Sequence, residues 1–517
     1  LVGKPIIRGT RLSVELILDR LADGWTAEDL YAAYPSLRPE TLRAVLAMAA
    51  EQDNPDLALE RVLPLVEAVA RRSAYLVLLT ENPGALRELL VQQQDALVAA
   101  ISEDFSNRSA DETLLAELMP SLHGIDYATR RIRKWMKPSR RSVGMQFMPA
   151  SAKVIYQPLG VAGIIVPWNY PLFLAIGPLT AALAAGNRVM IKMSESTPAT
   201  SQLIKDLLAR IFPEDLVSVA LGEAEVGVAF SRLPFDHLLF TGATSIGKHV
   251  MRAAAENLTP VTLELGGKSP AIVSAEVPLA DAAERIAFGK TLNAGQTCVA
   301  PDYVLVPRDR VEGFVSAYRE VVQRFYPQLQ DNPDYTAIIN ERQLARLNGY
   351  LQDAEAKGAR IVPLYPEAQG RRLPQSLVLD VNDEMKLMQD EIFGPLLPVV
   401  PYDRLEDAFA YVNARPRPLA LYYFGYDKHE QQRVLHETHS GGVCLNDTLL
   451  HVAQDDLPFG GIGPSGMGYY HGKDGFLTFS HAKAVYKQSG VNFQKLGGML
   501  PPYGEKAEKT LNTMIRK

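Results

Sequence analysis

Cys298 is the residue of this sequence that most needs a chemical explanation. It is one of only two cysteines in 517 residues, and it lies in the glycine- and glutamine-bearing stretch NAGQTCVAPDYV rather than in an apolar run. A single cysteine is most often a small buried hydrophobe, whereas its thiolate is a nucleophile towards carbonyl carbons. The other cysteine, Cys444, stands at no metal-ligand spacing from it. Two cysteines also build no disulfide framework, which predicts a reducing compartment such as the cytoplasm.

Two further polar side chains are candidates for catalysis because they stand within or directly after apolar strands. The stretch VTLELGGKSP places Glu264 among apolar residues, where burial would raise the pKa of a carboxyl group and suit it to general-base work. Strand alternation also allows Glu264 to face solvent, and the sequence leaves both orientations open. The stretch PWNYP supplies Asn169, a neutral amide donor of the kind that stabilises an oxyanion. A turn asparagine is the commoner alternative.

Glycine and charge patterns indicate a nucleotide site. In FTGATSIGKH, Gly242 and Gly247 stand between a strand and a helix, where backbone N–H groups and the helix dipole favour a phosphate. The spacing is also close to that of a P-loop, but His249 occupies the position of the Ser or Thr that binds magnesium. In VMIKMSES, Lys192 and Glu195 follow a buried strand. They would lie at the sheet edge where open α/β folds bind nucleotides, and both side chains can hydrogen-bond ribose hydroxyls.

Two loops near the end of the chain complete the candidates. The stretch EIFGP sets Glu391, which can hold a ribose, beside Phe393, which can pack against a flat ring. The uncharged loop PFGGIGPSGMG, residues 458–468, is rich in glycine, and its spacing alone assigns it no chemical role. Each of these patterns, taken singly, has a structural alternative, such as a strand-to-helix turn or a solvated strand end.

The elements that must position these residues alternate along the chain. Short apolar runs predict strands, and amphipathic runs such as SQLIKDLLARIF and GKHVMRAAAEN predict helices between them. Strands separated by helices imply an α/β protein with a parallel sheet. The runs that predict strands are AGIIVP, NRVMIKM, VSVAL, HLLFTG, PVTLELGG and PAIVSA.

Composition excludes several classes of function. The chain is 47% hydrophobic and 22% charged, with a net charge of -6, which argues against binding to nucleic acid or anionic lipid. Residues 154–187 carry no charge over a length that could span a membrane. Four prolines within this stretch would break such a helix, so we expect no membrane span. We also expect no signal peptide, because no uncharged apolar core follows the first basic residues.

The first part of the chain has a different character. Residues 1–54 predict three short helices and resemble an antitoxin-type, helix-turn-helix-like domain, which makes a DNA-binding regulator the alternative function. This segment holds six Lys and Arg but eight Asp and Glu, so it lacks the basic surface that phosphates require. Residues 55–90 also predict helix and resemble a segment of glutamine synthetase adenylyltransferases. The sequence therefore indicates that residues 1–90 are fused to an unrelated α/β protein, and a folded but inactive fusion is a further alternative.

Together and in this order, the motifs resemble those of the NAD(P)-dependent aldehyde dehydrogenase superfamily over residues 91–490. The motifs are PWN, GN-x-V-x-I-K-x-SE, FTG-x-x-x-x-G, LELGGKSP, G-Q-x-C, E-x-FGP and PFGG-x-G-x-SG-x-G. The resemblance implies the aldehyde dehydrogenase fold, preceded by an extra α-helical segment. It implies a Rossmann-like NAD-binding domain at 91–262 with part of an oligomerisation arm near 138–156. A catalytic domain at 263–455 and a return to the NAD domain and arm at 456–517 would follow.

The same resemblance assigns roles to the candidates. Cys298 matches the nucleophile that forms a thiohemiacetal and then a thioester, and its own backbone N–H and Asn169 match the oxyanion hole. Glu264 matches the base that activates water, and no metal is implied. Lys192 and Glu195 match contacts to the adenosine ribose. The remaining cofactor contacts are Gly242 and Gly247 near the pyrophosphate and Glu391 and Phe393 near the nicotinamide ribose.

The end of the chain indicates a branch of the superfamily. GPSGMGYYHGKDGFLTFSHAKAVY resembles the branch that includes coniferyl aldehyde dehydrogenases and the dimeric class with a short N-terminus. This implies a small aldehyde substrate, either aromatic such as coniferyl aldehyde or long-chain, and a homodimer in the cytoplasm. Glu195 favours NAD, with NADP as the alternative acceptor. One departure is Met193, which replaces the usual proline and would loosen the strand end.

Overall fold

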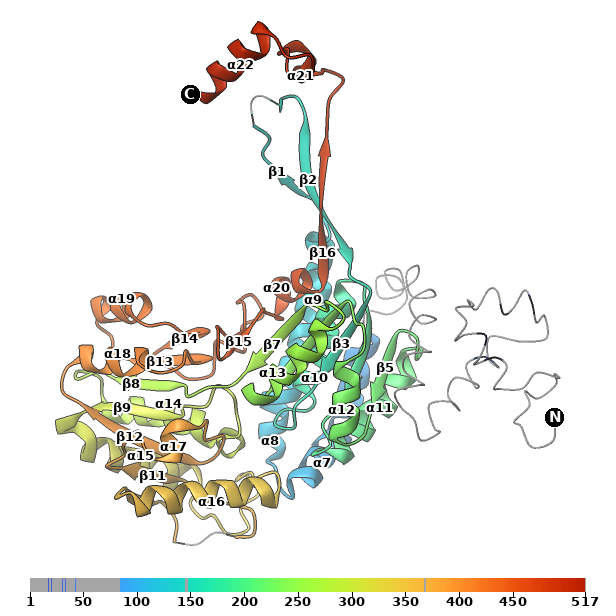
Figure 1. The fold of residues 1–517 in the computed structure, drawn as a ribbon. Helices are drawn as coiled ribbons and strands as arrows, with labels where there is room; N and C mark the ends of the chain where they lie inside the picture. Colours follow the sequence, from blue (N-terminus) through green and yellow to red (C-terminus); the bar gives the residue numbers. More distant parts are fainter. Residues whose placement is uncertain are drawn as a thin grey trace.

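The computed structural model describes residues 84–144, 147–366 and 369–516, together with Ile17, Arg20, Leu30, Ala33 and Leu42. The helices predicted within residues 1–54, and the segment 55–83, therefore lie outside the described residues apart from these single positions. The described chain forms two sheets flanked by helices and a long projecting arm (Figure 1). The predicted α/β class is confirmed.

The first sheet has six strands in the order β15-β7-β6-β3-β4-β5. Its strands are parallel except for β15, which pairs antiparallel with β7 at the edge. β3 and β6 are almost entirely buried, as expected for parallel strands covered on both faces. The strands are β3 (Val161–Ile165), β4 (Arg188–Lys192), β5 (Val217–Ala220), β6 (His237–Gly242), β7 (Val261–Leu265) and β15 (Gly466–Met467).

Helices cover both faces of this sheet. The uncharged stretch 154–187 forms a strand, a loop and the 12-residue helix α10, with Gly186 in the left-handed conformation after its end. No helix in the described part of the chain combines the length and apolar character that crossing a membrane requires. The helices are α10 (Phe173–Ala184), α11 (Pro198–Ile211), α12 (Ala224–Ser231), α13 (Thr244–Ala255) and α20 (Gly472–Thr478).

A helical segment before the sheet packs against it. Its helices are α6 (Ala85–Gln92), α7 (Gln94–Phe105), α8 (Ala110–Thr113), the π-helical turn η1 (Leu114–Leu118) and α9 (Met119–Trp135). The Asp104 carboxylate of α7 accepts hydrogen bonds from the N–H groups of Ala199 and Thr200 at 3.0 and 2.9 Å. It therefore caps the first turn of α11, which has no side-chain cap of its own.

The domain boundary expected at residue 90 falls inside α6. Leu86, Leu89 and Leu90 are buried in the same core as β3 and α10. Residues 85–90 thus pack as part of the α/β body rather than as a separate segment. The boundary expected at residue 262 likewise falls inside β7, all of which belongs to the six-stranded sheet.

The second sheet has seven strands in the order β10-β11-β12-β9-β8-β13-β14, parallel except between β10 and β11. Its strands are β8 (Pro270–Val273), β9 (Tyr303–Pro307), β10 (Arg360–Pro363), β11 (Ser376–Leu379), β12 (Leu396–Tyr402), β13 (Ala420–Phe424) and β14 (Gly442–Leu445). The flanking helices are α14 (Leu279–Thr291), η3 (Leu292–Gly295), η4 (Arg308–Arg310), α15 (Val311–Phe325), α16 (Glu341–Ala356), α17 (Lys386–Gln389), α18 (Leu405–Asn413) and α19 (Lys428–Glu437).

The arm is a three-stranded antiparallel sheet in the order β1-β2-β16. It consists of β1 (Ser139–Arg141), β2 (Ser151–Pro158) and β16 (Ser480–Lys487), followed by α21 (Phe493–Leu496) and α22 (Glu505–Ile515). Figure 1 shows it extending away from both sheets, with the C-terminal helices at its far end.

Candidate active site

Glu264 lies near the carboxyl end of β7 and is only 2% exposed. The orientation that the sequence left open is therefore the buried one. Thr241 Oγ1 donates to its Oε2 at 3.5 Å, and its Oε1 has no hydrogen-bond partner among the described residues. Burial raises the pKa of Glu264 to about 8. Its unpaired oxygen is thus free to accept a proton near neutral pH.

Cys298 is partly exposed and lies in the turn after η3. Burial of the sulfur, and then the nearby carboxyl groups of Glu264 and Glu391, raise the pKa of the thiol well above its ordinary value. The backbone N–H groups of Cys298 and Val299 oppose this increase. The structure thus brings the predicted nucleophile together with the predicted base.

The loop that presents Cys298 has a strained backbone. Asn293, Ala294 and Gly295 all have positive φ, at 53°, 51° and 74°, a conformation that costs energy for residues with side chains. A side chain at Gly295 would lie 2.4 Å from the Gly394 carbonyl oxygen, so the position requires glycine. Gln296 stabilises the loop by donating to the Asn293 and Ala337 carbonyls at 3.0 and 3.1 Å. The glutamine of the G-Q-x-C motif is therefore structural.

Asn169 follows β3 and is 3% exposed. Its neighbours on both sides contact other parts of the site. The Tyr170 hydroxyl lies 2.6 Å from Thr297 Oγ1, next to the cysteine. The Trp168 ring meets the Phe393 ring edge-on, with ring centres 5.2 Å apart. The loop that carries Asn169 is thus fixed against the Cys298 loop and the E-x-FGP loop.

Glu391 is held over the glycine pair of the LELGGKSP motif. A side chain at Gly266 would lie 2.1 Å from Glu391 Oε1, which explains why glycine is needed there. Lys268 forms an ion pair with Asp302 and also donates to the Asp390 carbonyl at 2.9 Å, and so anchors the segment that ends at Glu391. Burial, with Asp302 nearby, raises the pKa of Glu391 to about 8.

Four of the predicted cofactor residues, Lys192, Glu195, Gly242 and Gly247, lie along the carboxyl edge of the six-stranded sheet. Lys192 ends β4, and its Nζ lies 3.8 Å from Glu195 Oε2. Gly247 packs closely, because a side chain there would lie 2.7 Å from Leu265. The first turn of α13, which follows Gly242, has no side-chain cap and so leaves N–H groups for an anion. β4 is three strands from β7, about 14 Å, a separation that suits the two ends of a dinucleotide.

Met193 does not loosen the strand end as the sequence suggested. Its side chain is 1% exposed, and its N–H donates to the Ala220 carbonyl at 3.2 Å. Its own carbonyl accepts from Lys192 Nζ at 2.6 Å. A proline has no N–H to donate, so methionine adds a hydrogen bond at this position.

Tyr470 is a site residue that sequence reasoning missed. It follows the glycine-rich loop, is 1% exposed, and lies close enough to Glu264 and Cys298 for both to raise the pKa of its hydroxyl. The hydroxyl faces Glu264, but the geometry falls short of a formed hydrogen bond. The only signal in the sequence was the pair of tyrosines, Tyr469 and Tyr470, after the G-x-SG-x-G loop.

Two family models match the chain. The model described as the aldehyde dehydrogenase family matches residues 84–485. A model described as a protein of unknown function, DUF433, matches residues 1–49. Because that description assigns no function, the antitoxin-type resemblance of residues 1–54 stays a prediction. The resemblance of residues 55–90 to adenylyltransferases is wrong for residues 84–90, which belong to the aldehyde dehydrogenase match, and stays a prediction for residues 55–83.

Curated relatives and solved structures agree with the first match. The chain is 77% identical over 425 residues to a probable coniferyl aldehyde dehydrogenase of Pseudomonas aeruginosa, covering 82% of this chain and 89% of the relative. It is 49% identical over 433 residues to a coniferyl aldehyde dehydrogenase of Pseudomonas sp., covering 83% and 89%. Staphylococcus aureus AldH in a substrate-bound state has a TM-score of 0.81 at 36% identity, covering 88% of this chain and 99% of that chain.

Proposed function

The chain belongs to the aldehyde dehydrogenase family and is an oxidoreductase acting on aldehydes with NAD or NADP, and we propose that Cys298, Glu264 and Asn169 perform the chemistry. The observation that carries this proposal is the unpaired, buried Oε1 of Glu264 beside the partly exposed Cys298. A base with a raised pKa next to a nucleophile in a closed site suits acyl transfer to water.

The steps follow from these groups. The Cys298 thiol releases its proton to solvent and its Sγ attacks the aldehyde carbon, and the carbonyl oxygen becomes an oxyanion that accepts hydrogen bonds from the Asn169 amide and the Cys298 N–H. Loss of hydride from that carbon leaves a thioester on Cys298. Glu264 then takes a proton from water as the water oxygen attacks the thioester carbon. Cleavage of the C–S bond releases the carboxylic acid and a Cys298 thiolate, which takes the proton from Glu264, so that the thiol and the base are both restored.

The nicotinamide cofactor, when bound, supplies the hydride acceptor. Lys192 and Glu195 would hold its adenosine ribose, the first turn of α13 after Gly242 its pyrophosphate, and Glu391 its nicotinamide ribose. The carboxylate of Glu195 would repel a 2′-phosphate, so we propose a preference for NAD. The ratio of kcat/KM for NAD over NADP should therefore fall in Glu195→Gln, and an unchanged ratio would contradict this assignment.

For the substrate, we propose an aromatic aldehyde such as coniferyl aldehyde, with long-chain aldehydes as the alternative. The names of the Pseudomonas relatives support the aromatic class. The test is NADH formation with a panel of coniferyl, benzyl-type and long-chain aldehydes. A higher kcat/KM for long-chain aldehydes than for coniferyl aldehyde would overturn the aromatic assignment.

The two cysteines provide a matched pair of variants. Cys298→Ala should abolish turnover with every aldehyde. Cys444→Ala should retain turnover, because Cys444 is a buried residue of β14 and its sulfur contacts His451 Nδ1 at 3.3 Å. Turnover that survives in Cys298→Ala, or that is lost equally in both variants, would contradict the assignment of the nucleophile.

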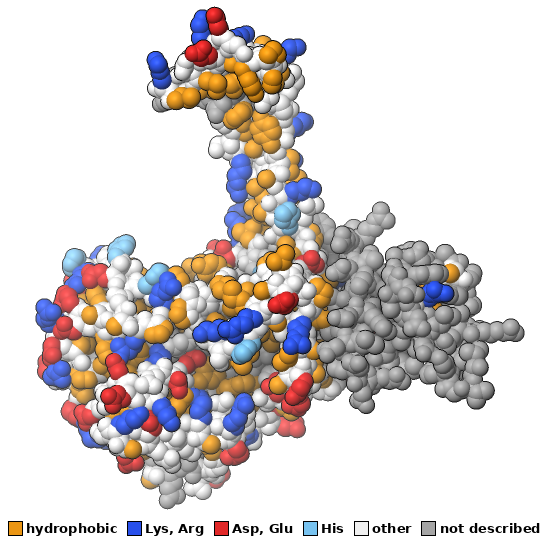
Figure 2. All heavy atoms as spheres, in the orientation of Figure 1, with side chains coloured by type: hydrophobic (Ala, Val, Ile, Leu, Met, Phe, Trp, Pro, Cys, Tyr) orange, Lys and Arg blue, Asp and Glu red, His pale blue; other side chains and the backbone are white. Residues whose placement is uncertain are grey.

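We also propose that the chain forms a homodimer, in the cytoplasm, through the arm. β16 is an eight-residue edge strand that is mostly exposed, and unpaired edges of this length favour pairing with another chain. Figure 2 shows hydrophobic side chains along the arm and at its far end. Exposed hydrophobic residues of β16 and of the segment that follows it include Tyr486, Tyr503 and Ile515, which are 53%, 71% and 78% exposed. Light scattering on the purified protein should give twice the chain mass, and a monomer would refute the proposal.

A further inference from the structure

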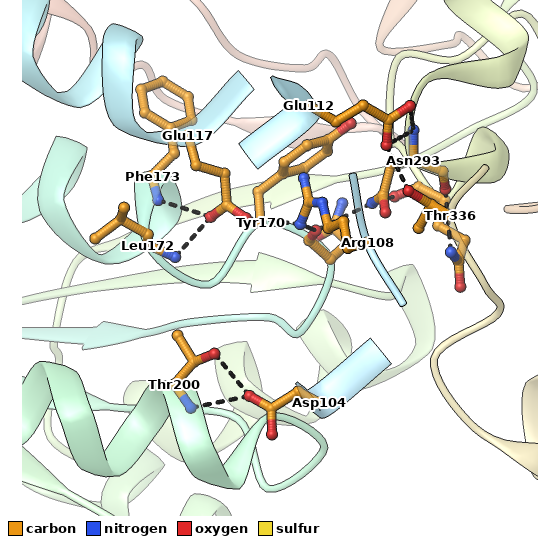
Figure 3. Close-up of polar contacts among 12 residues, drawn as sticks. Asp104, Arg108, Glu112, Glu117, Tyr170, Leu172, Phe173, Thr200, Asn293 and Thr336 are labelled. Carbon is orange, nitrogen blue, oxygen red and sulfur yellow. Dashed lines mark hydrogen bonds and ion pairs between the residues drawn. The ribbon is translucent and has the colours of Figure 1, made fainter. Parts of the chain in front are cut away.

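A buried ionic cluster lies beside the Asn169 loop, on the segment between α7 and α9. Arg108 and Glu117 both have fully buried side chains, and Arg108 Nη1 lies 2.6 Å from Glu117 Oε1. Figure 3 shows this pair between α10 and the segment that carries Asn293. No sequence motif singled out either residue, and the mechanism above does not use them.

Arg108 reaches the backbone of the proposed oxyanion hole. Its Nη1 donates to the Asn169 carbonyl at 3.0 Å, and its guanidinium lies 4.8 Å from the centre of the Tyr170 ring. Its Nε and Nη2 are buried and have no hydrogen-bond partner among the described residues. Burying a charged group with unmade hydrogen bonds opposes stability, so stability alone explains this arginine poorly.

Asn293 reaches the same carbonyl from the cysteine loop. Its Nδ2 donates to the Asn169 carbonyl at 3.1 Å and to the Gln296 carbonyl at 3.1 Å. Glu112 fixes Asn293 in turn, because its carboxylate accepts from the Asn293 N–H at 3.2 Å and from Thr336 Oγ1 at 2.5 Å. The carbonyl of Asn169 therefore has two donors, one from each side of the site.

Glu117 fixes the other end of the same loop. Its Oε2 accepts hydrogen bonds from the N–H groups of Leu172 and Phe173 at 2.7 and 3.2 Å, at the start of α10 (Figure 3). Residues 169–173 are thus held at both ends, and the Arg108–Glu117 ion pair joins the two attachments. The side chain of Asn169 extends from the backbone that these contacts immobilise.

We propose that Arg108, Glu117 and Asn293 are positioning residues that hold the Asn169 amide where the oxyanion forms. The inference rests on the proposed function of Asn169 as the oxyanion donor. Removing one such donor costs about 10²- to 10³-fold in rate, and a displacement of about 1 Å can cost about 10²-fold. Loss of one of the two donors to the Asn169 carbonyl should therefore slow formation of the thioester by about 10- to 100-fold.

A double-mutant cycle tests the proposal. The single-turnover rate of NADH formation is measured for Asn293→Ala, Asn169→Ala and the double variant, with saturating NAD and coniferyl aldehyde. We expect Asn293→Ala to slow this step about 10- to 100-fold, and to add less than about twofold in the Asn169→Ala background, because the group it positions is absent. Equal losses in both backgrounds, or an unchanged rate in Asn293→Ala, would overturn the proposal.

Asn187→Ala is the matched control. Asn187 is also a buried asparagine that bridges backbone groups, donating to the Ala182 and Phe479 carbonyls at 3.0 and 2.8 Å. It precedes β4, at the opposite edge of the sheet from Asn169. The control should lower Tm and leave the single-turnover rate unchanged. An equal fall in rate in Asn187→Ala would show that general destabilisation causes the effect and would overturn the proposal.

A second variant covers the case in which Asn293→Ala fails to fold. Arg108→Lys keeps a positive charge opposite Glu117 and shortens the reach to the Asn169 carbonyl. In a double-mutant cycle with Asn169→Ala, it should likewise slow the single-turnover rate about 10- to 100-fold alone and less than about twofold in the Asn169→Ala background. The proposed function fails separately: if Asn169→Ala alone leaves the rate unchanged, Asn169 is not the oxyanion donor and both proposals fall. If Asn169→Ala is slow and the losses add, only the positioning role is refuted.

Discussion

Hydrolysis of the thioester should depend on pH in a way set by the burial of Glu264. Only the ionised carboxylate can take a proton from water, and burial raises its pKa to about 8. About a tenth of the groups would be ionised at pH 7 and about nine tenths at pH 9. The rate of hydrolysis should therefore rise about tenfold between these values and level off above pH 9.

The assay separates this step from hydride transfer. Stopped-flow mixing with coniferyl aldehyde gives a burst of NADH from the first turnover, and the later steady rate reports hydrolysis wherever a burst is present. Glu264→Gln keeps the shape of the side chain but removes the base. It should lower the steady rate by about 10²- to 10⁴-fold and preserve the burst. A steady rate in the wild type that is flat from pH 6 to pH 9, or a Glu264→Gln variant that keeps the tenfold rise, would refute the reasoning.

Three other changes have definite expected results. Tyr470→Phe removes a neighbouring hydroxyl that lowers the pKa of Glu264, so the midpoint of the steady-rate pH profile should move to higher pH. An unmoved midpoint would show that Tyr470 does not influence the ionisation of Glu264. Gly266→Ala would place a methyl group 2.1 Å from Glu391 Oε1, so KM for NAD should rise more than KM for the aldehyde, whereas equal rises would argue against a cofactor role of Glu391. Leu90→Ala removes a side chain that is 2% exposed and should lower the free energy of unfolding, measured by urea titration, by about 2–5 kcal/mol. A change below about 0.5 kcal/mol would show that α6 is not part of the α/β body.

The sequence was sufficient for features that depend on local patterns. Apolar runs located five of the six strands of the first sheet, β3 to β7 but not β15, and their order placed Asn169, Lys192, Gly242 and Glu264 at or near strand ends. Parallel strands bring these ends to one edge of the sheet. The strand pattern did not include Cys298, and only the resemblance to the superfamily assigned the nucleophile to the same site as Glu264.

Features that depend on distant pairing could not be predicted in this way. The end of β7 that carries Glu264 pairs edge to edge with β15, which is about 200 residues further along the chain. Arg108 meets Asn169 across 61 residues, and Asn293 meets it across 124. Neither contact leaves a periodic signal, because periodicity reports only which side of an element is apolar.

Met193 shows the limit of comparing residue types alone. Replacing a proline suggested a looser strand end, but the consequence depended on whether a carbonyl was available to the new N–H. The neighbouring strand β5 supplies the Ala220 carbonyl at 3.2 Å. The sequence position of the substitution was informative, and its effect was decided by strand pairing.

The most direct test is to trap the thioester on the enzyme. Glu264→Gln is mixed with NAD and coniferyl aldehyde, and the protein is analysed by intact mass and by peptide mapping. The mechanism predicts one acyl group per chain on the peptide that contains Cys298, formed together with one equivalent of NADH. An acyl group on Cys444 instead, or steady turnover with no adduct in Cys298→Ala, would contradict it.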